Sequence, residues 1–243
     1  MKRSFTAIIV GWLAIGLFEP AVSGQGTFRN LGFATTVGPD PTPRTVTFSS
    51  AFPGWSAYYN SSPFSSTDPV MYNNPTIGTA ALVLIGPSFG GISNFTALLQ
   101  GSTFDGSPDV SLAQIGLIPA GTMSLRFLAF HGGPTPQFVV SLNGQPVQYS
   151  TLQDFGTFRE YGADISAFTG QVAELRFTQR SLFPFANNLA LDNISFSTVG
   201  VPEPSTWALL ALGGALFWCA ARRRRKYTPV AFMPDPPGLK TLL

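Results

Sequence analysis

The segment Gly86-Pro-Ser88-Phe-Gly90 matches the Gly-x-Ser-x-Gly pattern that places a nucleophilic serine on a sharp turn in acyl hydrolases. Such a serine needs a histidine base, and His131 is the only histidine in the chain. The pattern also needs a helix directly after the serine, and the residues after Ser88 show no helical apolar period. A turn between two strands explains the glycines better, so a secreted ester hydrolase is a lesser hypothesis.

Two pairs of carboxylates are spaced closely enough to act together. Asp105 and Asp109 lie in one turn-like segment, and Glu160 and Asp164 lie in another. Paired carboxylates could hydrolyse a glycosidic bond, and Asp105 and Asp109 with backbone carbonyl oxygens could bind a structural calcium ion. Aspartate is also an ordinary residue of solvated turns. The spacing leaves all three interpretations open, and solvated turn residues are the simplest.

Aromatic side chains gather in a Ser-, Asn- and Pro-rich segment at residues 52–75. Trp55, Tyr58 and Tyr59 in this segment could bind a sugar, because a pyranose offers an apolar face to an aromatic ring and a rim of hydroxyls to polar side chains. Long loops often carry binding sites. We interpret the three rings as candidate ligand-binding residues, with packing in the core or over a sheet edge as the alternative.

The elements that would position these residues have the pattern of strands and turns. The chain contains 25 Gly and 21 Pro, which interrupt it at short intervals, and no long stretch keeps a 3.6-residue apolar period. Asn143-Gly144 between two apolar segments predicts a hairpin with a type I′ turn. Alternating or continuously apolar segments predict strands at residues 44–49, 79–85, 110–118, 122–130, 137–142, 147–149, 172–178 and 189–197.

These short strands favour one all-β domain at residues 24–200, built as a two-sheet sandwich. The strand at residues 122–130 is apolar on both faces, which is typical of a central position. The body carries six basic and nine acidic residues without a basic cluster, so we expect no nucleic-acid partner. The single Cys excludes an internal disulfide, and the single His excludes a multi-histidine metal site.

Residues 1–23 have the pattern of a secretory signal peptide. Lys2 and Arg3 precede an apolar run at residues 5–18, and Ala21 and Ser23 occupy the −3 and −1 positions of a cleavage site. The run of about 14 residues is short for a membrane span, which favours cleavage after Ser23 over an N-terminal anchor. We therefore expect export across the inner membrane.

Residues 201–226 combine three features in a fixed order. Pro202, Glu203 and Pro204 form an extended segment, an apolar helix is expected at about residues 205–221, and a basic cluster follows. The cluster comprises Arg222, Arg223, Arg224, Arg225 and Lys226. Its positive charges predict a transmembrane helix with a cytoplasmic C-terminus. The Pro-rich residues 227–243 are expected to be a disordered cytoplasmic tail.

This order of features resembles the PEP-CTERM sorting domain, a module also labelled the C-terminal domain of ice-binding proteins. The resemblance covers residues 201–226, and Pro202, Glu203 and Pro204 match the motif residue by residue. It implies a partner of the exosortase type, a membrane protease that processes the signal and releases or anchors the body. Such proteins usually end soon after the basic cluster, whereas this chain continues to Leu243.

The last strands of the body resemble jelly-roll modules of the carbohydrate-binding type in exported bacterial proteins. The resemblance covers about 60 residues from Phe138 to Phe196. It implies a loop at residues 164–170 before a core strand, and an aspartate near a structural calcium ion on the last strand. Asp192 is the matching residue. Asp192, Asp105 or Asp109 would then supply calcium ligands together with backbone carbonyl oxygens.

Together these patterns predict an exported, non-enzymatic protein of the cell surface or extracellular matrix. A single C-terminal helix would anchor it until the sorting signal is processed. The main alternative is a polysaccharide-binding module with a defined sugar ligand. A secreted ester or glycoside hydrolase is the lesser alternative.

Overall fold

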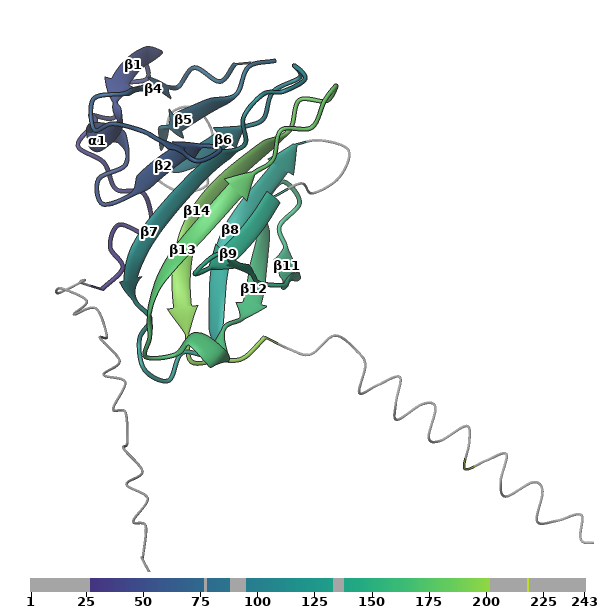
Figure 1. Cartoon of the computed structure of the whole chain (residues 1–243). Coiled ribbons are helices and arrows are strands. Elements are labelled where there is room, and N and C mark those ends of the chain that lie inside the picture. Colours follow the sequence, from purple (N-terminus) through teal and green to yellow (C-terminus); the bar gives the residue numbers. More distant parts are fainter. Residues whose placement is uncertain (1–26, 77, 88–94, 133–137, 202–217, 219–243) are drawn as a thin grey trace, which may run out of the picture. The chain divides into compact units, whose positions relative to one another are not determined.

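The computed structural model describes residues 27–76, 78–87, 95–132, 138–201 and 218. The chain divides into two compact units, Met1–Gly200 and Val201–Leu243. The described part of the first unit consists of two β-sheets packed as a sandwich (Figure 1). In the second unit the structure describes Val201 and Trp218, and Trp218 is helical and exposed.

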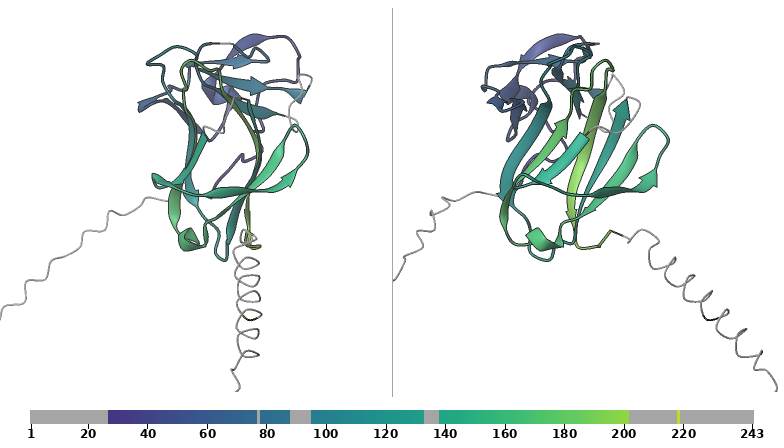
Figure 2. Two further views of the ribbon diagram at one scale, coloured as in Figure 1. Left: turned by 90° about the vertical axis from the view of Figure 1, so that its right-hand side faces the viewer. Right: turned by 45° about the vertical axis from the view of Figure 1, so that its right-hand side comes forward.

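The larger sheet has eight strands and the smaller sheet has six, and Figure 2 shows them stacked face to face. The order in the larger sheet is β1 (Arg44–Thr47), β4 (Pro69–Tyr72), β5 (Ala81–Ile85), β6 (Thr96–Gln100), β14 (Asn188–Ser197), β8 (Ser124–Gly132), β12 (Arg159–Asp164) and β11 (Tyr149–Asp154). The order in the smaller sheet is β10 (Gln145–Pro146), β9 (Phe138–Leu142), β13 (Val172–Gln179), β7 (Val110–Leu117), β2 (Ser56–Tyr59) and β3 (Ser62–Pro63). Among these strands β4 and β5 pair in parallel, and the other neighbours pair antiparallel.

The core lies between the sheets because apolar residues alternate along each long strand. On β13, Ala173, Leu175 and Phe177 are buried and face inward, whereas the intervening residues face outward. Phe127 of β8 meets Phe177 of β13 edge-on across the sandwich, with ring centroids 5.2 Å apart. Such edge-to-face contacts join the two sheets in addition to the burial of apolar area.

The Asn143-Gly144 hairpin is confirmed. Asn143 and Gly144 have φ angles of 49° and 75°, as a type I′ turn requires, and β9 pairs with β10 on either side of them. The strand expected at residues 147–149 is only partly right. The Val147 N–H donates to the Val140 carbonyl oxygen of β9 at 2.9 Å, and the chain then enters the larger sheet as β11 at Tyr149. The return side of the hairpin therefore consists of the two-residue strand β10 and the hydrogen-bonded Val147.

The central position of β8 is confirmed, since this strand pairs with β14 and with β12. Its two apolar faces differ in burial. Leu125, Phe127 and Ala129 are buried, whereas Phe130 on the other face is 38% exposed. The strand is therefore apolar on both faces but fully buried on only one of them.

Several strands escaped the sequence analysis. The segment 52–75, expected to be a loop, contains β2, β3 and β4, and β6 and β12 were also missed. These strands are short, and β6 is buried on both faces, so an alternating pattern is absent. The segment expected as a loop at residues 164–170 contains a 3₁₀ turn at Ser166–Phe168 and precedes β13.

The predicted signal peptide at residues 1–23, the basic cluster and the tail at residues 227–243 lie outside the described residues. The predicted helix at about residues 205–221 also lies outside them, apart from Trp218. Within the described part of the chain, no helix is long and apolar enough to cross a membrane.

A candidate ligand pocket in the aromatic segment

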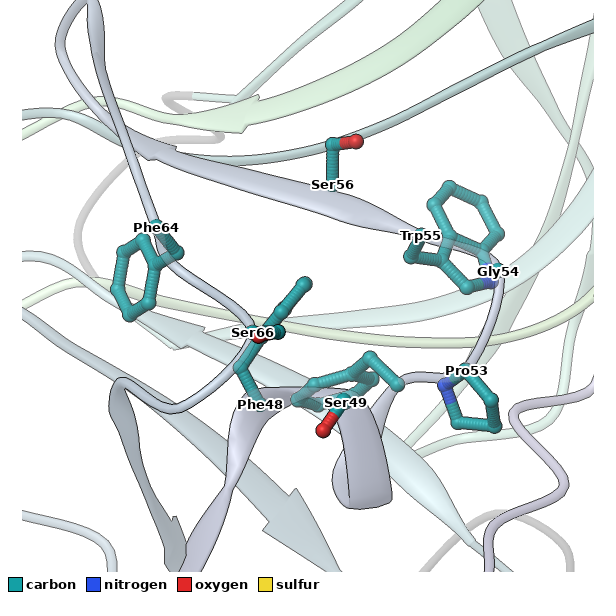
Figure 3. A pocket seen from close by; sticks show the side chains of 9 residues that line it. Phe48, Ser49, Pro53, Gly54, Trp55, Ser56, Phe64 and Ser66 are labelled. Atoms are coloured by element: carbon teal, nitrogen blue, oxygen red, sulfur yellow. The ribbon is translucent and has the colours of Figure 1, made fainter.

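A pocket of about 410 Å³ opens in the segment where the sequence gathers aromatic residues (Figure 3). Four aromatic rings and three serines account for most of its lining. The lining residues are Phe48, Ser49, Phe52, Pro53, Gly54, Trp55, Ser56, Phe64 and Ser66. Figure 3 shows Trp55 and Phe64 on opposite sides of the hollow, so aromatic surface bounds it at both ends.

The chain builds this pocket by folding back on itself within about twenty residues. The short helix α1 (Phe48–Ala51) follows β1, and a turn at Pro53 and Gly54 leads into β2. Gly54 has a φ angle of 88°, a conformation that a residue with a Cβ atom rarely adopts. The turn therefore depends on glycine and brings Trp55 back over α1.

The loop after β3 closes the other side of the pocket. The Ser49 backbone N–H donates to the Ser66 carbonyl oxygen at 3.0 Å, and the Phe64 N–H donates to the Ala57 carbonyl oxygen at 2.9 Å. The Phe48 N–H donates to the Asp68 carbonyl oxygen at 2.9 Å. These bonds hold Phe64 and Ser66 against α1, so the pocket wall does not depend on side chains alone.

Ring contacts fix the aromatic surfaces. The Phe48 ring lies 5.9 Å from Phe52 and 5.7 Å from Phe64, measured between centroids. Trp55 packs on Phe33, with centroids 5.3 Å apart, and is only 5% exposed. Most of the aromatic rings that line the pocket thus belong to the hydrophobic core. The partly buried Phe64 offers more of its ring to solvent.

The serine hydroxyls supply the polar side of the pocket. Ser49, Ser56 and Ser66 are exposed. The Ser49 hydroxyl lies 3.5 Å from that of Thr47, and within the described part of the chain no hydrogen bond joins the hydroxyl of Ser56 or Ser66 to another residue. Both hydroxyls can therefore donate to and accept from a bound ligand.

The structure separates the three predicted aromatic residues. Trp55 lines the pocket. Tyr58 lies on the outer face of the smaller sheet, where the guanidinium carbon of Arg176 is 4.1 Å from its ring centroid. Arg176 in turn makes two hydrogen bonds to Glu174, at 2.8 and 3.1 Å.

Tyr59 faces inward. Its ring is 4.7 Å from that of Phe64, and its hydroxyl donates to the Ala80 carbonyl oxygen at 3.4 Å. Burial raises the pKa of Tyr59. Tyr59 therefore supports the Phe64 wall from behind, and Tyr58 belongs to a separate surface.

The candidate calcium ligands do not come together as one group. Within the described ranges, no cluster of three or more His, Cys, Asp or Glu residues could hold a metal ion. Asp109 accepts a hydrogen bond from the Ser181 N–H at 2.8 Å, and the exposed Asp105 accepts one from the Gly106 N–H at 2.9 Å. Asp192 is fully buried on β14 and accepts a hydrogen bond from the Thr96 hydroxyl at 3.2 Å. A calcium site built from one of them with carbonyl oxygens stays a prediction.

The second carboxylate pair is also divided between two partners. Glu160 forms an ion pair with Arg126 at 3.5 Å, and Asp164 accepts a hydrogen bond from the Ser166 N–H at 2.9 Å. Both arrangements are ordinary structural roles, an ion pair on a sheet face and a turn cap.

The residues of the hydrolase hypothesis are described only in part. Ser88 lies outside the described residues. His131 lies at the end of β8, and its buried Nδ1 atom has no hydrogen-bond partner within the described residues. Burial, followed by the positive charge of Arg159, lowers the pKa of His131. The described strand before Ser88, β5, belongs to a mostly antiparallel sheet, unlike the parallel sheet that carries such a serine in α/β-hydrolases.

Sequence reasoning missed Phe48, Ser49, Ser56 and Ser66 as pocket residues. Phe48 was expected within a strand at residues 44–49, which would have continued β1 instead of starting α1. Ser56 and Ser66 lie in the Ser-rich segment at residues 52–75, and Ser49 lies just before it, but composition does not say which serines line one hollow. The pairing of the residue 64–68 loop with α1 decides that.

Comparisons with known proteins bear on the two units differently. Residues 200–226 match the PEP-CTERM protein-sorting motif, which confirms the resemblance predicted from the Pro-Glu-Pro segment, the apolar stretch and the basic cluster. Pro202, Glu203, Pro204 and the cluster from Arg222 to Lys226 fall within the match but outside the described residues. No curated protein matches the chain.

Among solved structures, the chain is similar to an apo-form cyclase from Fischerella sp., with 14% sequence identity and a TM-score of 0.42, covering 70% of this chain and 94% of that one. A structure described as CBM4 has 15% identity and a TM-score of 0.32, covering 62% of this chain and 99% of that one. The N-terminal cellulose-binding domain of β-1,4-glucanase C from Cellulomonas fimi has 17% identity and a TM-score of 0.28, covering 61% of this chain and 91% of that one.

Proposed function

We propose that this protein is an exported surface or matrix protein whose sandwich binds polysaccharide without altering it chemically. The sorting motif at residues 200–226 supports the location. The observation that carries the binding function is the pocket bounded by Trp55 and Phe64, whose lining combines aromatic rings with exposed serines.

This combination suits a sugar ring for physical reasons. The apolar face of a pyranose loses little by leaving water and gains contact with an aromatic ring, while its hydroxyls still need hydrogen-bond partners. Phe64 offers a partly exposed ring, and the exposed Ser66 hydroxyl has no hydrogen-bond partner among the residues that the structure describes. A volume of about 410 Å³ falls in the range of roughly 300–1,000 Å³ typical of small-molecule sites.

The lining also favours binding over catalysis at this site. None of the nine lining residues is a carboxylate or a histidine. Glycoside hydrolysis usually needs two carboxylates on either side of the scissile bond, and a serine nucleophile needs a base within hydrogen-bond reach. Among the described lining residues there are therefore groups that can hold a sugar, but not the usual groups that cleave one.

Sorting depends on residues 201–226. A protease of the exosortase type acts near Pro202-Glu203-Pro204, after the apolar helix has inserted with the basic cluster on the cytoplasmic side. Before processing, this helix anchors the protein in the inner membrane, and afterwards the body reaches the cell surface. Glu203 is the one ionisable residue of the Pro-Glu-Pro segment, so it is the natural position to test.

The test of sorting compares the wild type with Glu203→Ala in a host that has the protease. We expect the variant to accumulate in the membrane fraction at a higher mass than the wild-type product. The matched control is Glu174→Ala, which removes a carboxylate from the outer face of β13 and should leave processing unchanged. Identical masses and fractions for wild type and Glu203→Ala would refute the sorting role of this segment.

The test of binding fills the pocket without touching the core. Ser66→Trp places a large side chain at the exposed rim, and Ser166→Trp is the control at another exposed serine, in the 3₁₀ turn. Calorimetry with a panel of neutral oligosaccharides should show binding by the wild type and the control, and at least about tenfold weaker binding by Ser66→Trp. Equal affinities for all three proteins would place the ligand elsewhere, and no binding by the wild type would refute the function.

A further inference from the structure

A second hollow of about 550 Å³ adjoins the aromatic pocket. Arg29, Asn30, Ala34, Pro53 and Gly54 line it, and it shares Pro53 and Gly54 with the aromatic pocket. We infer that the two hollows form one groove for a polysaccharide chain, and that the Arg29 end of the groove takes an acidic sugar unit. This inference rests on the proposed function, because the aromatic pocket is one half of the groove.

Hydrogen bonds connect the chain segments that line the two hollows. The Trp55 Nε1–H donates to the Asn30 carbonyl oxygen at 3.0 Å, which joins the floor of one hollow to the wall of the other. The Asn30 Nδ2–H donates to the Pro53 carbonyl oxygen at 2.9 Å. Pro53 lines both hollows and, with Gly54, forms the ridge between them. A ligand that crosses the ridge therefore meets surfaces whose relative positions are already set, which lowers the entropy cost of binding.

The Arg29 backbone is held in place independently of its side chain. The Gln114 side-chain amide accepts from the Arg29 N–H at 2.5 Å and donates to the Arg29 carbonyl oxygen at 2.8 Å. Gln114 lies on β7 and is only 7% exposed. Asn30 continues in the left-handed region, with a φ angle of 54°. The sheet therefore positions Arg29 at the rim, while its guanidinium group stays exposed.

The positive charge of Arg29 in the groove favours an anionic ligand. Arg29 is the one charged residue in the combined lining of the two hollows, and none of the ion pairs within the described residues involves it. The body as a whole carries more acidic than basic residues, so a lone cation in a groove is not part of a general basic surface. A guanidinium group binds carboxylate or sulfate with two parallel hydrogen bonds, and either group occurs on acidic sugars.

The lining of the two hollows predicts which part of the ligand each hollow binds. A neutral part of the sugar chain lies against Phe64 and the serines, and the acidic unit lies beyond Pro53 and Gly54, within reach of Arg29. The aromatic pocket then supplies affinity for sugar chains in general, and Arg29 supplies the preference for acidic ones.

The experiment uses the full-length chain and matched oligosaccharides. Neutral gluco-, galacto- and manno-oligosaccharides are compared with the uronic-acid oligosaccharides of the same sugars and with sulfated galacto-oligosaccharides, by calorimetry at low and high salt. We expect one acidic series to bind about tenfold more tightly than its neutral counterpart, with a preference that shrinks as salt increases. The series that shows the preference, uronate or sulfate, identifies the anionic group.

Two arginine variants decide the role of the charge. Arg29→Gln should remove the acidic preference and leave neutral binding within twofold, because the backbone bonds to Gln114 remain. Arg180→Gln, at another exposed arginine outside the described ion pairs, should keep the preference. Neutral binding without an acidic preference, or a preference that survives Arg29→Gln, overturns this inference and leaves the proposed function standing. Absence of binding by every oligosaccharide overturns both.

Discussion

The indole Nε1 of Trp55 donates a hydrogen bond to the backbone carbonyl oxygen of Asn30, 3.0 Å away and 25 positions earlier in the chain. Trp55 is buried and also packs on Phe33. One side chain thus lines the aromatic pocket, fills the core and holds the segment that carries Arg29. Stability and binding are therefore coupled at this residue.

Trp55→Phe tests that coupling. The variant keeps a ring in the core but removes the indole donor, and the Asn30 carbonyl oxygen keeps only the Phe33 N–H, at 3.2 Å. We expect a loss of about 1–2 kcal/mol in the free energy of unfolding, against about 3–5 kcal/mol for Trp55→Ala. Urea unfolding measures both. An unfolding free energy unchanged by Trp55→Phe would contradict a structural role for the bond.

Gly101 and Asn187 define a second position where the packing tolerates little change. A Cβ atom on Gly101 would lie 1.8 Å from the Asn187 Oδ1 atom and 3.1 Å from the Arg180 carbonyl oxygen. Asn187 is 2% exposed, and its Nδ2–H donates to that same carbonyl oxygen at 2.6 Å. We expect Gly101→Ala to destabilise the protein by about 1–3 kcal/mol, the usual cost of overpacking.

A double variant separates the clash from other causes. Asn187→Ala removes the atom that the new methyl group would meet, so the losses from Gly101→Ala and Asn187→Ala should be less than additive. Gly106→Ala is an unsuitable control because its φ angle of 72° adds backbone strain. Gly38→Ala is a suitable one, since a Cβ atom there meets nothing within 4 Å. Additive losses would show that the clash is relieved without involving Asn187.

The lowered pKa of His131 predicts how the free energy of unfolding changes with pH near neutrality. Burial lowers the pKa of His131 in the folded protein below its ordinary value of 6.5, so folding favours the neutral ring. This contribution to stability is present above pH 6.5 and is lost as the pH falls from 6.5 through the lower folded pKa. We expect the free energy of unfolding to decrease over that range, and His131→Gln to remove the decrease.

The single histidine makes this experiment easy to interpret. Chemical unfolding from pH 5 to pH 8 is the measurement, and proton resonances of the imidazole ring give the folded pKa directly. The carboxyl groups whose pKa is lowered, Asp40 and Asp154, start from a value of 3.8 and therefore act at more acidic pH. A folded pKa at or above 6.5 would refute the prediction.

The raised pKa of Tyr149 predicts a second loss of stability, at alkaline pH. Burial, together with the neighbouring Tyr161, raises the pKa of Tyr149 to about 12 from an ordinary value of 10. The neutral phenol is therefore favoured in the folded state, and its contribution is present below pH 10 and lost as the pH rises from 10 to 12. Its hydroxyl donates to the Phe138 carbonyl oxygen at 3.0 Å.

Tyr149→Phe tests this assignment. The variant should lose about 1 kcal/mol at neutral pH through the missing hydrogen bond and should lose less stability than the wild type between pH 10 and pH 12. Tyr58→Phe, on the outer face of the smaller sheet, is the matched control. Absorbance titration of phenolate, combined with unfolding at each pH, measures both effects. Equal alkaline losses in wild type and Tyr149→Phe would exclude Tyr149 as the cause.

Local chemistry in the sequence was enough to predict several features. Asn143 and Gly144 specify their turn because both accept a positive φ angle, whatever surrounds them. The alternation of Leu175, Arg176, Phe177 and Thr178 specifies which side of β13 faces the core. The sorting motif is likewise readable from consecutive residues, since it consists of an order of residue types.

The pocket was decided by tertiary structure, because its walls come from contacts between separated segments. The sequence indicated that Trp55 and its neighbours could bind a sugar, but Ser66 faces the same hollow only because its carbonyl oxygen accepts from the Ser49 N–H. Arg29 had no feature in the sequence that marked it as a site residue. Its place at the groove depends on Gln114, 85 positions later in the chain, because hydrogen bonds between the Gln114 side chain and the Arg29 backbone, and not local propensity, hold it there.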